Sequence, residues 1–233
     1  MIDWQNNSNQ IKADFDGNGF VMLPSFFSPP EMTQLNAEVD RYRIEVLPNL
    51  SSHGAFYQVE GQPETMLRMS LMSDHDRYFK DLLFSDPLVK LAELLMGDEV
   101  KCRNLDWFGK PVRTGDETPP HQDGFYFKLD PSEALTFWLA LDTVDEKNGC
   151  VRYVPGSHRR GMRPHQPTDI LGFSKGITDY GDEDYKAEVQ IHAVPGDMIA
   201  HHCMVIHRAD PNPSERERGA LGMIYYARRA KAT

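Results

Sequence analysis

The first hundred residues carry two helix signals and one strand signal. Residues 28–31 (SPPE) have the form of a capping box, with a serine N-cap, proline in the first turn and glutamate three residues on. The apolar positions that follow have the spacing of one helix face: Leu35, Val39, Tyr42 and Val46. A second helix is predicted after Asp86-Pro87 and ends at Gly97, with four inward positions: Leu88, Leu91, Leu94 and Leu95. Residues 19–25 (GFVMLPS) predict a short strand.

From residue 99 the pattern changes to short runs rich in β-branched and aromatic residues, separated by clusters of Gly, Pro, Asn and Asp. This punctuation predicts a mainly β domain, an antiparallel sandwich or barrel, rather than strands that alternate with helices. The runs are 100–108, 117–127, 134–141, 150–154, 188–194, 197–206 and 219–227. Residues 159–187 form the longest stretch without periodicity, and loops of this length often act as lids over a site.

Length and charge narrow the class of protein. The 233 residues fit a single domain, 1–233, with a mixed part at about 1–98 and a β core at about 99–230. The net charge of −10 disfavours nucleic-acid binding, which needs a concentrated basic face. We expect the one basic cluster to be a solvated loop face: Arg159, Arg160 and Arg163. Three isolated cysteines, the polar N-terminus and the lack of a membrane-length apolar run predict a cytoplasmic protein that does not bind membranes.

One segment pairs a histidine with a carboxylate. In TPPHQDGFYF, His121 and Asp123 are two residues apart, and such residues point to the same face of a strand. One strand end could therefore offer an imidazole nitrogen and a carboxylate oxygen to one ion. The triplet alone also fits an ordinary polar surface strand.

A second segment adds a histidine and an arginine. His207 and Arg218 flank the turn signal at residues 212–214 (NPS), so we expect a hairpin with the two side chains opposite each other on neighbouring strands. Two histidines and a carboxylate on one face of a metal leave three open positions, as in non-haem Fe(II) oxygenases. The arginine fork could then grip the far carboxylate of a 2-oxo acid.

Several other residues could take part or serve the fold. His201 and His202 compete with His207 as the distal ligand, although neither is followed by a turn that brings an arginine across, so we expect them to support a ligand or to pack. Arg216 is the fallback for Arg218, and His158 is expected to fix a turn. We expect three methionines to fill the core: Met66, Met69 and Met72.

These segments resemble the phytanoyl-CoA dioxygenase (PhyH) family of Fe(II)/2-oxoglutarate-dependent oxygenases. The likeness runs in order through PPHQDGFYF, LTFWLAL, EKNGCVRYVPGSHRRG, VPGDMIAHH and IHRADPNPSERERG, with a weaker likeness in NGFVMLPSFFSPPEM. It implies a double-stranded β-helix core, which is a jelly-roll or cupin-like sandwich, with helices packed outside.

The resemblance also implies roles for single residues. The metal ligands would be His121, Asp123 and His207, and Arg218 would bind the distal carboxylate of 2-oxoglutarate. Trp138 would line the cosubstrate pocket. Further candidates for polar contacts with the cosubstrate are Asn104 and Lys110. The aromatic residues after the HxD pair could wall a substrate pocket or belong to the core: Phe125, Tyr126 and Phe127.

The activity implied is hydroxylation of an aliphatic C–H bond of a small molecule, with Fe(II), 2-oxoglutarate and O2, releasing succinate and CO2. Asp123 fills the position that a halogenase leaves open for chloride, which favours hydroxylation. The alternatives are a catalytically inactive β-barrel binding module and a cupin-like enzyme that uses another divalent metal. The intact ligand set counts against the first, and Arg218 counts against the second. The few basic residues in 159–187 favour a small polar molecule over a CoA ester.

Overall fold

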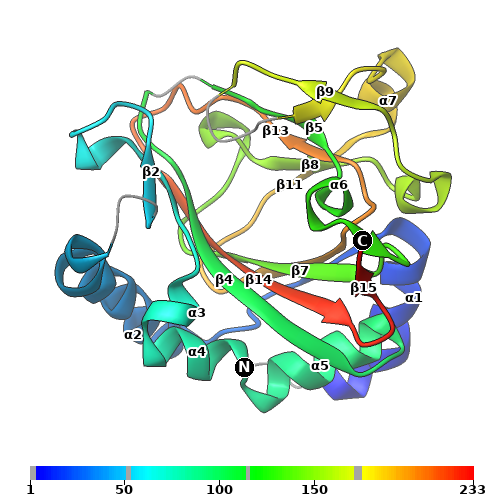
Figure 1. Ribbon diagram of the computed structural model, residues 1–233, viewed down its shortest axis with the longest axis horizontal. Coiled ribbons are helices and arrows are strands. Elements are labelled where there is room, and N and C mark those ends of the chain that lie inside the picture. Colours follow the sequence, from blue (N-terminus) through cyan, green and yellow to red (C-terminus); the bar gives the residue numbers. More distant parts are fainter. Residues whose placement is uncertain (1–3, 51–53, 114–115, 171–174) are drawn as a thin grey trace.

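Two antiparallel sheets face each other and form the centre of the protein, as the computed structural model in Figure 1 shows. The structure describes residues 4–50, 54–113, 116–170 and 175–233. The major sheet has the order β1 (Phe20–Leu23), β12 (Met198–His202), β7 (Ala134–Ala140), β14 (Arg218–Ala227), β4 (Val100–Lys110), β3 (Met66–Met69) and β2 (Ala55–Tyr57). The minor sheet has the order β11 (Val189–Ile191), β8 (Val151–Tyr153), β13 (His207–Ala209) and β5 (Thr118–His121).

The chain passes repeatedly from one sheet to the other. It runs from β4 in the major sheet to β5 in the minor sheet, then through β7, β8, β11, β12, β13 and β14 with five further crossings. Two hairpins stand beside the sheets: β9 (His165–Pro167) with β10 (Lys175–Ile177), and β6 (Leu129–Asp130) with β15 (Lys231–Ala232). This is the double-stranded β-helix that the sequence predicted.

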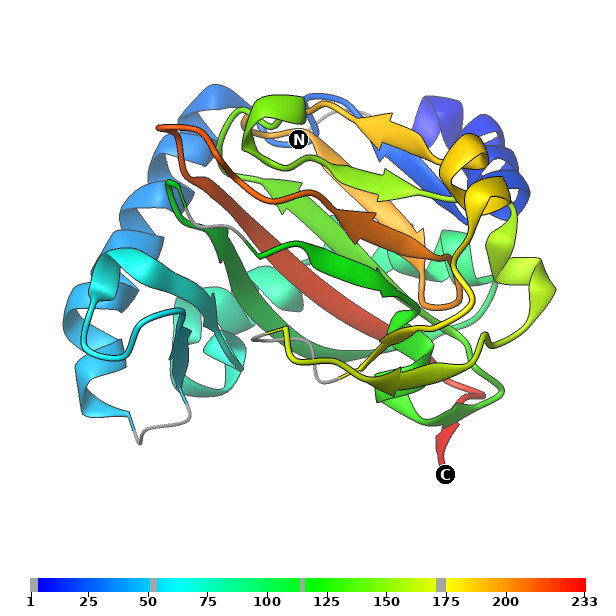
Figure 2. The same ribbon diagram turned by 90° about the horizontal axis from the view of Figure 1, so that it is seen from above.

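Helices cover the outer face of the major sheet (Figures 1 and 2). These are α1 (Ser8–Asn18), α2 (Pro29–Arg41), α3 (Met72–His75), α4 (Arg77–Leu83) and α5 (Asp86–Met96). Two short helices, α6 (Asp123–Phe127) and α7 (Asp182–Ala187), lie nearer the minor sheet. Short 3-10 helices occupy Trp4–Asn7, Leu47–Asn49, Pro63–Thr65, Glu146–Asn148 and Ser157–Arg160, and a π turn occupies Tyr42–Val46. No helix of the described residues is long and apolar enough to cross a membrane.

Strand β7 contributes side chains both to the main core and to the cavity between the sheets. All seven of its residues are buried, because helices cover one face of the sheet and the minor sheet covers the other. Its odd-numbered apolar residues, such as Phe137, pack with the helices in the main core. The alternate residues Thr136 and Trp138 face the cavity between the sheets. Because successive side chains on a strand point to opposite faces, one set of β7 residues packs in the core and the other set lines the cavity.

The helix predictions hold with small differences. Glu31 accepts from the backbone N–H of Ser28 at 2.8 Å, as the capping box requires. Leu35, Val39 and Tyr42 are buried, but Val46 is only half-buried, because the π turn changes the helical register. Helix α5 ends before a left-handed Gly97 with Leu88, Leu91 and Leu95 buried and Leu94 half-buried. The three methionines lie in the core.

Two predictions about the β core were wrong. The run 117–127 is not one strand: β5 ends at His121, and α6 begins at Asp123, an acidic residue suited to a first helical turn. His207 and Arg218 do not form a hairpin, since β13 belongs to the minor sheet and β14 to the major sheet. The connection crosses between sheets because the Asn212 side chain donates to the carbonyls of Lys110, at 2.9 Å, and Pro111, at 3.0 Å, on the major sheet's side.

The stretch 159–187 contains more structure than its composition suggested. It holds the hairpin of β9 and β10 and helix α7, while residues 171–174 lie outside the described residues. Its basic cluster is only partly solvated, since Arg163 is paired with Asp179 and Asp184.

Candidate active site

Two histidines meet on neighbouring strands of the minor sheet. His121 ends β5 and His207 begins β13, directly opposite it in the antiparallel register. Their ring centroids are 4.1 Å apart, and both side chains are nearly inaccessible to solvent. Asp123 reaches the same point from the start of α6, two residues after His121. One ligand atom from each of these residues lies within 4.8 Å of the others.

Backbone carbonyls fix the tautomer of both histidines. His121 Nδ1 lies 2.8 Å from the carbonyl oxygen of Pro119, and His207 Nδ1 lies 3.2 Å from that of Val205. A carbonyl only accepts, so each Nδ1 donates its proton to that carbonyl. Burial, with the neighbouring His121, holds the pKa of His207 well below its usual value. A neutral imidazole protonated at Nδ1 is the form that binds a metal through Nε2.

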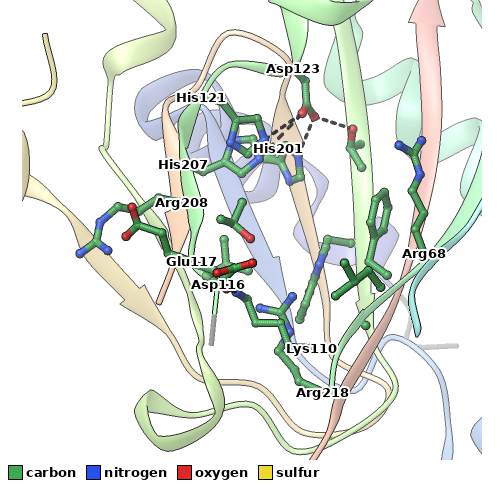
Figure 3. Close-up of a pocket in the computed structure, with 18 of the residues that line it drawn as sticks. Arg68, Lys110, Asp116, Glu117, His121, Asp123, His201, His207, Arg208 and Arg218 are labelled. Carbon is green, nitrogen blue, oxygen red and sulfur yellow. Dashed lines mark hydrogen bonds and ion pairs between the residues drawn. The ribbon is translucent and has the colours of Figure 1, made fainter. Parts of the chain in front are cut away.

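The two oxygens of the Asp123 carboxylate have different neighbours (Figure 3). Its Oδ1 lies 3.6 Å from His121 Nε2 and 3.8 Å from His207 Nε2. Its Oδ2 lies 3.2 Å from His201 Nε2 and 3.1 Å from Thr136 Oγ1. Burial opposes ionisation of Asp123, but the adjacent histidines outweigh it and hold the pKa of this carboxyl well below its usual value. The cluster thus combines two imidazole nitrogens with one anionic carboxylate oxygen.

Cationic side chains lie at the other end of the same cavity (Figure 3). Arg218 on β14 is paired in register with Lys110 on β4, and the Arg218 guanidinium lies 5.6 Å from the ring centroid of Trp138. Arg218 Nη1 donates to the carbonyl of Gly149 at 2.6 Å, whereas its buried Nε has no hydrogen-bond partner among the described residues. A buried donor without a partner is costly and fits a ligand that accepts from it. A carboxylate between these two cations would supply that acceptor.

The cavity between these two ends has a volume of about 320 Å³. Its buried lining residues include His121, His201, Trp138 and Arg218. Its more exposed lining residues mark the mouth: Phe56, Arg68, Asp116, Glu117 and Tyr126. Such a volume is at the small end of ligand-binding pockets in proteins.

Not every predicted site residue lines the cavity. Tyr126 and Phe127 line it, but Phe125 stacks on His165 at a centroid distance of 4.3 Å and lies outside the lining. Asn104 also lies outside, because its amide donates to Asp106 Oδ1 at 3.1 Å within β4. Arg216 pairs with Asp145 at 2.7 Å rather than facing the cavity. His158 Nε2 lies 3.2 Å from the carbonyl of Asp16, consistent with a role in fixing a turn.

The sequence analysis missed Gln122, which lies between the two residues of the HxD pair. Its side chain is fully buried and donates to the carbonyls of Met204 at 2.8 Å and Gly161 at 3.1 Å. Its Oε1 accepts from the backbone N–H of Arg163 at 2.8 Å. Gln122 therefore ties the 159–187 stretch to the segment that carries the cluster. Its position inside the motif was the only sequence signal.

A double-stranded β-helix with two histidines and a carboxylate on one side of its cavity is the arrangement of non-haem iron oxygenases. A model of the phytanoyl-CoA dioxygenase (PhyH) family matches residues 15–220. The chain therefore belongs to the phytanoyl-CoA dioxygenase family, as its motifs predicted.

Individual relatives agree with this assignment. Human peroxisomal phytanoyl-CoA dioxygenase is 31% identical over 220 residues, which cover 89% of this chain and 64% of the human protein. The cattle, mouse and rat proteins of the same name match over a similar share, so this chain spans about 65% of the length of these relatives.

Solved structures share the fold. EvdO2 from Micromonospora carbonacea var. aurantiaca, complexed with 2-oxoglutarate, is 26% identical with a TM-score of 0.76, covering 100% of this chain and 94% of that one. SnoK from nogalamycin biosynthesis, a non-haem α-ketoglutarate-dependent carbocyclase, is 25% identical with a TM-score of 0.78, covering 98% and 87%. These findings confirm the predicted jelly-roll fold and a family of enzymes that depend on iron, 2-oxoglutarate and O2.

Proposed function

We propose that this chain hydroxylates an aliphatic C–H bond of a small molecule, with Fe(II) held by His121, Asp123 and His207. The observation that carries the proposal is the convergence of two carbonyl-anchored imidazoles and one carboxylate oxygen within 4.8 Å, opposite a buried arginine. Bound iron and 2-oxoglutarate would supply the oxidation: 2-oxoglutarate, O2 and R–H give succinate, CO2 and R–OH.

The residues of the chain would bind and orient. Arg218, held by the carbonyl of Gly149, would use its unpartnered Nε for the distal carboxylate of 2-oxoglutarate. Lys110 would add a second positive charge, and Trp138 would form the wall beside Arg218. The buried floor of the cavity would keep water from the reacting atoms. The three ligands and Arg218 together disfavour an inactive binding module, and Arg218 disfavours a cupin-like enzyme that handles no diacid.

Hydroxylation is the reaction that Asp123 favours within this class. A halogenase needs a small residue there to admit chloride, and this position holds a carboxylate that His201 and Thr136 orient. SnoK is a carbocyclase, so relatives with this fold also perform other oxidations. The products of turnover, once a substrate is found, would distinguish hydroxylation from ring closure or epimerisation by the gain of one oxygen atom.

The mouth of the cavity favours a small substrate over a CoA ester. Arg68 is the only cation among the exposed lining residues named above, and its Nε already donates to the buried Asp106 at 3.1 Å. Asp116 and Glu117 bring negative charge to the opposite part of the lining (Figure 3). The phosphates of coenzyme A would therefore meet little net positive charge. We therefore propose a small, uncharged or weakly charged substrate. Separately, we propose that the protein is cytoplasmic.

The decisive experiment is an anaerobic titration of the purified protein with Fe(II) and then 2-oxoglutarate, followed by the visible charge-transfer band of a chelated 2-oxo acid. We expect a band in the wild type and none in His207→Ala. Arg218→Ala should need roughly 10- to 100-fold more 2-oxoglutarate, the range for losing a hydrogen-bonded charge.

Arg216→Ala is the matched control, because Arg216 pairs with Asp145 and does not line the cavity. It should leave the titration unchanged. A wild-type protein that binds iron but gives no band with 2-oxoglutarate would overturn the proposed function.

A further inference from the structure

Behind the candidate ligand Asp123 lies a group of three buried polar side chains, His201, Thr136 and Tyr153, that are not among the proposed metal ligands. His201 on β12 and Thr136 on β7 are direct cross-strand partners in the major sheet. Both reach across the cavity to the same atom, Asp123 Oδ2, at 3.2 and 3.1 Å. Tyr153, on β8 of the opposite sheet, places its hydroxyl 3.0 Å from His201 Nδ1. Side chains from both sheets and α6 thus converge on one carboxylate.

The direction of each hydrogen bond follows from its acceptor. An ionised carboxylate only accepts, so Thr136 Oγ1 and His201 Nε2 both donate to Asp123. In the tautomer with its proton on Nε2, His201 has a lone pair on Nδ1, which accepts from the Tyr153 hydroxyl. The order is therefore Tyr153 to His201 to Asp123, with every group satisfied inside the protein.

Packing holds these groups in place. His201 and Tyr153 are buried, and Phe20 stacks on the Tyr153 ring with a centroid distance of 4.6 Å. The same Tyr153 ring stacks on His207 at 5.6 Å, so one residue contacts both His201 and a candidate ligand. A buried side chain with packed neighbours loses little further entropy when it orients a ligand.

We propose that His201, supported by Tyr153, is a positioning residue that keeps Asp123 a one-oxygen ligand of the iron. Two donors occupy Oδ2, which leaves Oδ1 for the metal on the side of His121 and His207. A carboxylate that bound through both oxygens would take one of the three positions needed by 2-oxoglutarate and O2. This inference rests on the proposed function and adds a role for residues outside its ligand set.

The test compares two substitutions at one position. His201→Leu removes the donor, whereas His201→Gln keeps an N–H at similar reach. We expect His201→Leu to bind Fe(II) roughly 10- to 100-fold more weakly, the usual effect of losing a partner of a metal ligand. His201→Gln should recover most of that affinity. Tyr153→Phe, which removes only a hydroxyl, should lose less than His201→Leu because the bond to Asp123 remains.

Two measurements separate orientation from folding. Metal affinity is read from the anaerobic charge-transfer titration and, independently, from the thermal shift produced by Mn(II), which needs no turnover. The melting temperature of each metal-free variant reports the fold. His202→Leu is the matched control: it lies next to His201 on β12 but on the other side, against Phe15, and should keep wild-type metal affinity.

The possible outcomes are distinct. Unchanged Fe(II) and Mn(II) affinity in folded His201→Leu overturns the inference, as does a His201→Gln variant that binds as weakly as the leucine variant. An equal loss in His202→Leu would also overturn it. If His201→Leu does not fold, His201→Gln and Tyr153→Phe still decide, since the first must bind nearly as wild type and the second more weakly. A wild-type protein that binds Mn(II) but gives no band with Fe(II) and 2-oxoglutarate contradicts the proposed function instead.

Discussion

Among single residues, the buried Lys110 has a lowered pKa that bears on ligand binding and on stability. Burial, and then the nearby charge of Arg218, lower the pKa of Lys110 from 10.5 to about 7. The Lys110 ammonium is therefore charged below about pH 7 in the free protein and neutral above it. A bound dianion beside Lys110 would favour the charged form, so binding above pH 7 requires uptake of a proton.

If Lys110 and Arg218 bind 2-oxoglutarate as proposed, its affinity should fall as the pH rises above about 7. The dissociation constant, measured by the anaerobic titration between pH 6 and 9, should rise up to tenfold per unit. Lys110→Met should bind more weakly at pH 6 and lose this dependence. An equally steep pH dependence in Lys110→Met would assign it to another group.

The lowered pKa of Lys110 also affects the stability of the ligand-free protein. The folded pKa of Lys110, about 7, lies below the value of 10.5 expected in the unfolded chain. Between these values the unfolded state binds more protons, so this group's contribution to the free energy of unfolding rises with pH. Urea denaturation at pH 7 and 9 should show a smaller rise in Lys110→Met than in the wild type.

At the scale of elements, the turn before β8 supports the cosubstrate end of the cavity. Gly149 has φ = 78°, and a side-chain methyl there would collide with the carbonyl oxygen of Asp210. The Gly149 carbonyl also accepts from Arg218 Nη1. Glycine is required at position 149 because the backbone is left-handed there and no room is left for a side chain. The position of Arg218 depends on this turn through the bond to the Gly149 carbonyl.

We predict that Gly149→Ala destabilises the protein by more than about 1–3 kcal/mol, the range for left-handed strain alone, and weakens 2-oxoglutarate binding. Gly61→Ala is the matched control, because Gly61 has φ = 79° but open space, to 4 Å, where a side-chain methyl would lie. It should show the strain cost without the loss of binding. Equal effects of the two substitutions in denaturation and titration would contradict the proposed importance of this contact.

At the scale of the whole molecule, one apolar cluster joins the two parts that composition separates. Its buried members run from Trp4 to Ala230 and include helix α5 residues packed with residues of β7 and β14. Strands β2 and β3 from the first hundred residues extend the major sheet beside β4. Residues 1–98 therefore share a core with the β-helix.

We predict a single unfolding transition by calorimetry, because neither part keeps its core without the other. Mn(II) with 2-oxoglutarate at about 100 times their dissociation constants should raise the melting temperature by roughly 10–20 °C. Two separate transitions would show that residues 1–98 and the β core are independent domains. A shift with Mn(II) alone in His207→Ala would place the metal elsewhere.

The sequence by itself determined the family, the β-rich core and the chemistry of the ligands, because these depend on local pattern. The apolar run 134–141 already predicts strand β7, and SPPE already encodes the start of α2. His121, Asp123 and His207 could be named as candidate ligands from residue type and motif order alone, and the structure brings all three together.

Only the tertiary structure decided how these residues meet. Local signals predicted a hairpin joining His207 to Arg218, but sheet membership depends on contacts between distant segments, and Asn212 anchors the connection to residues about a hundred positions away. The same reason explains why the hydrogen-bond network of His201, Thr136 and Tyr153 behind Asp123 could not be predicted. They come from three strands in two sheets, and no spacing along the chain records that His201 and Thr136 share one carboxylate or that Tyr153 contacts His201.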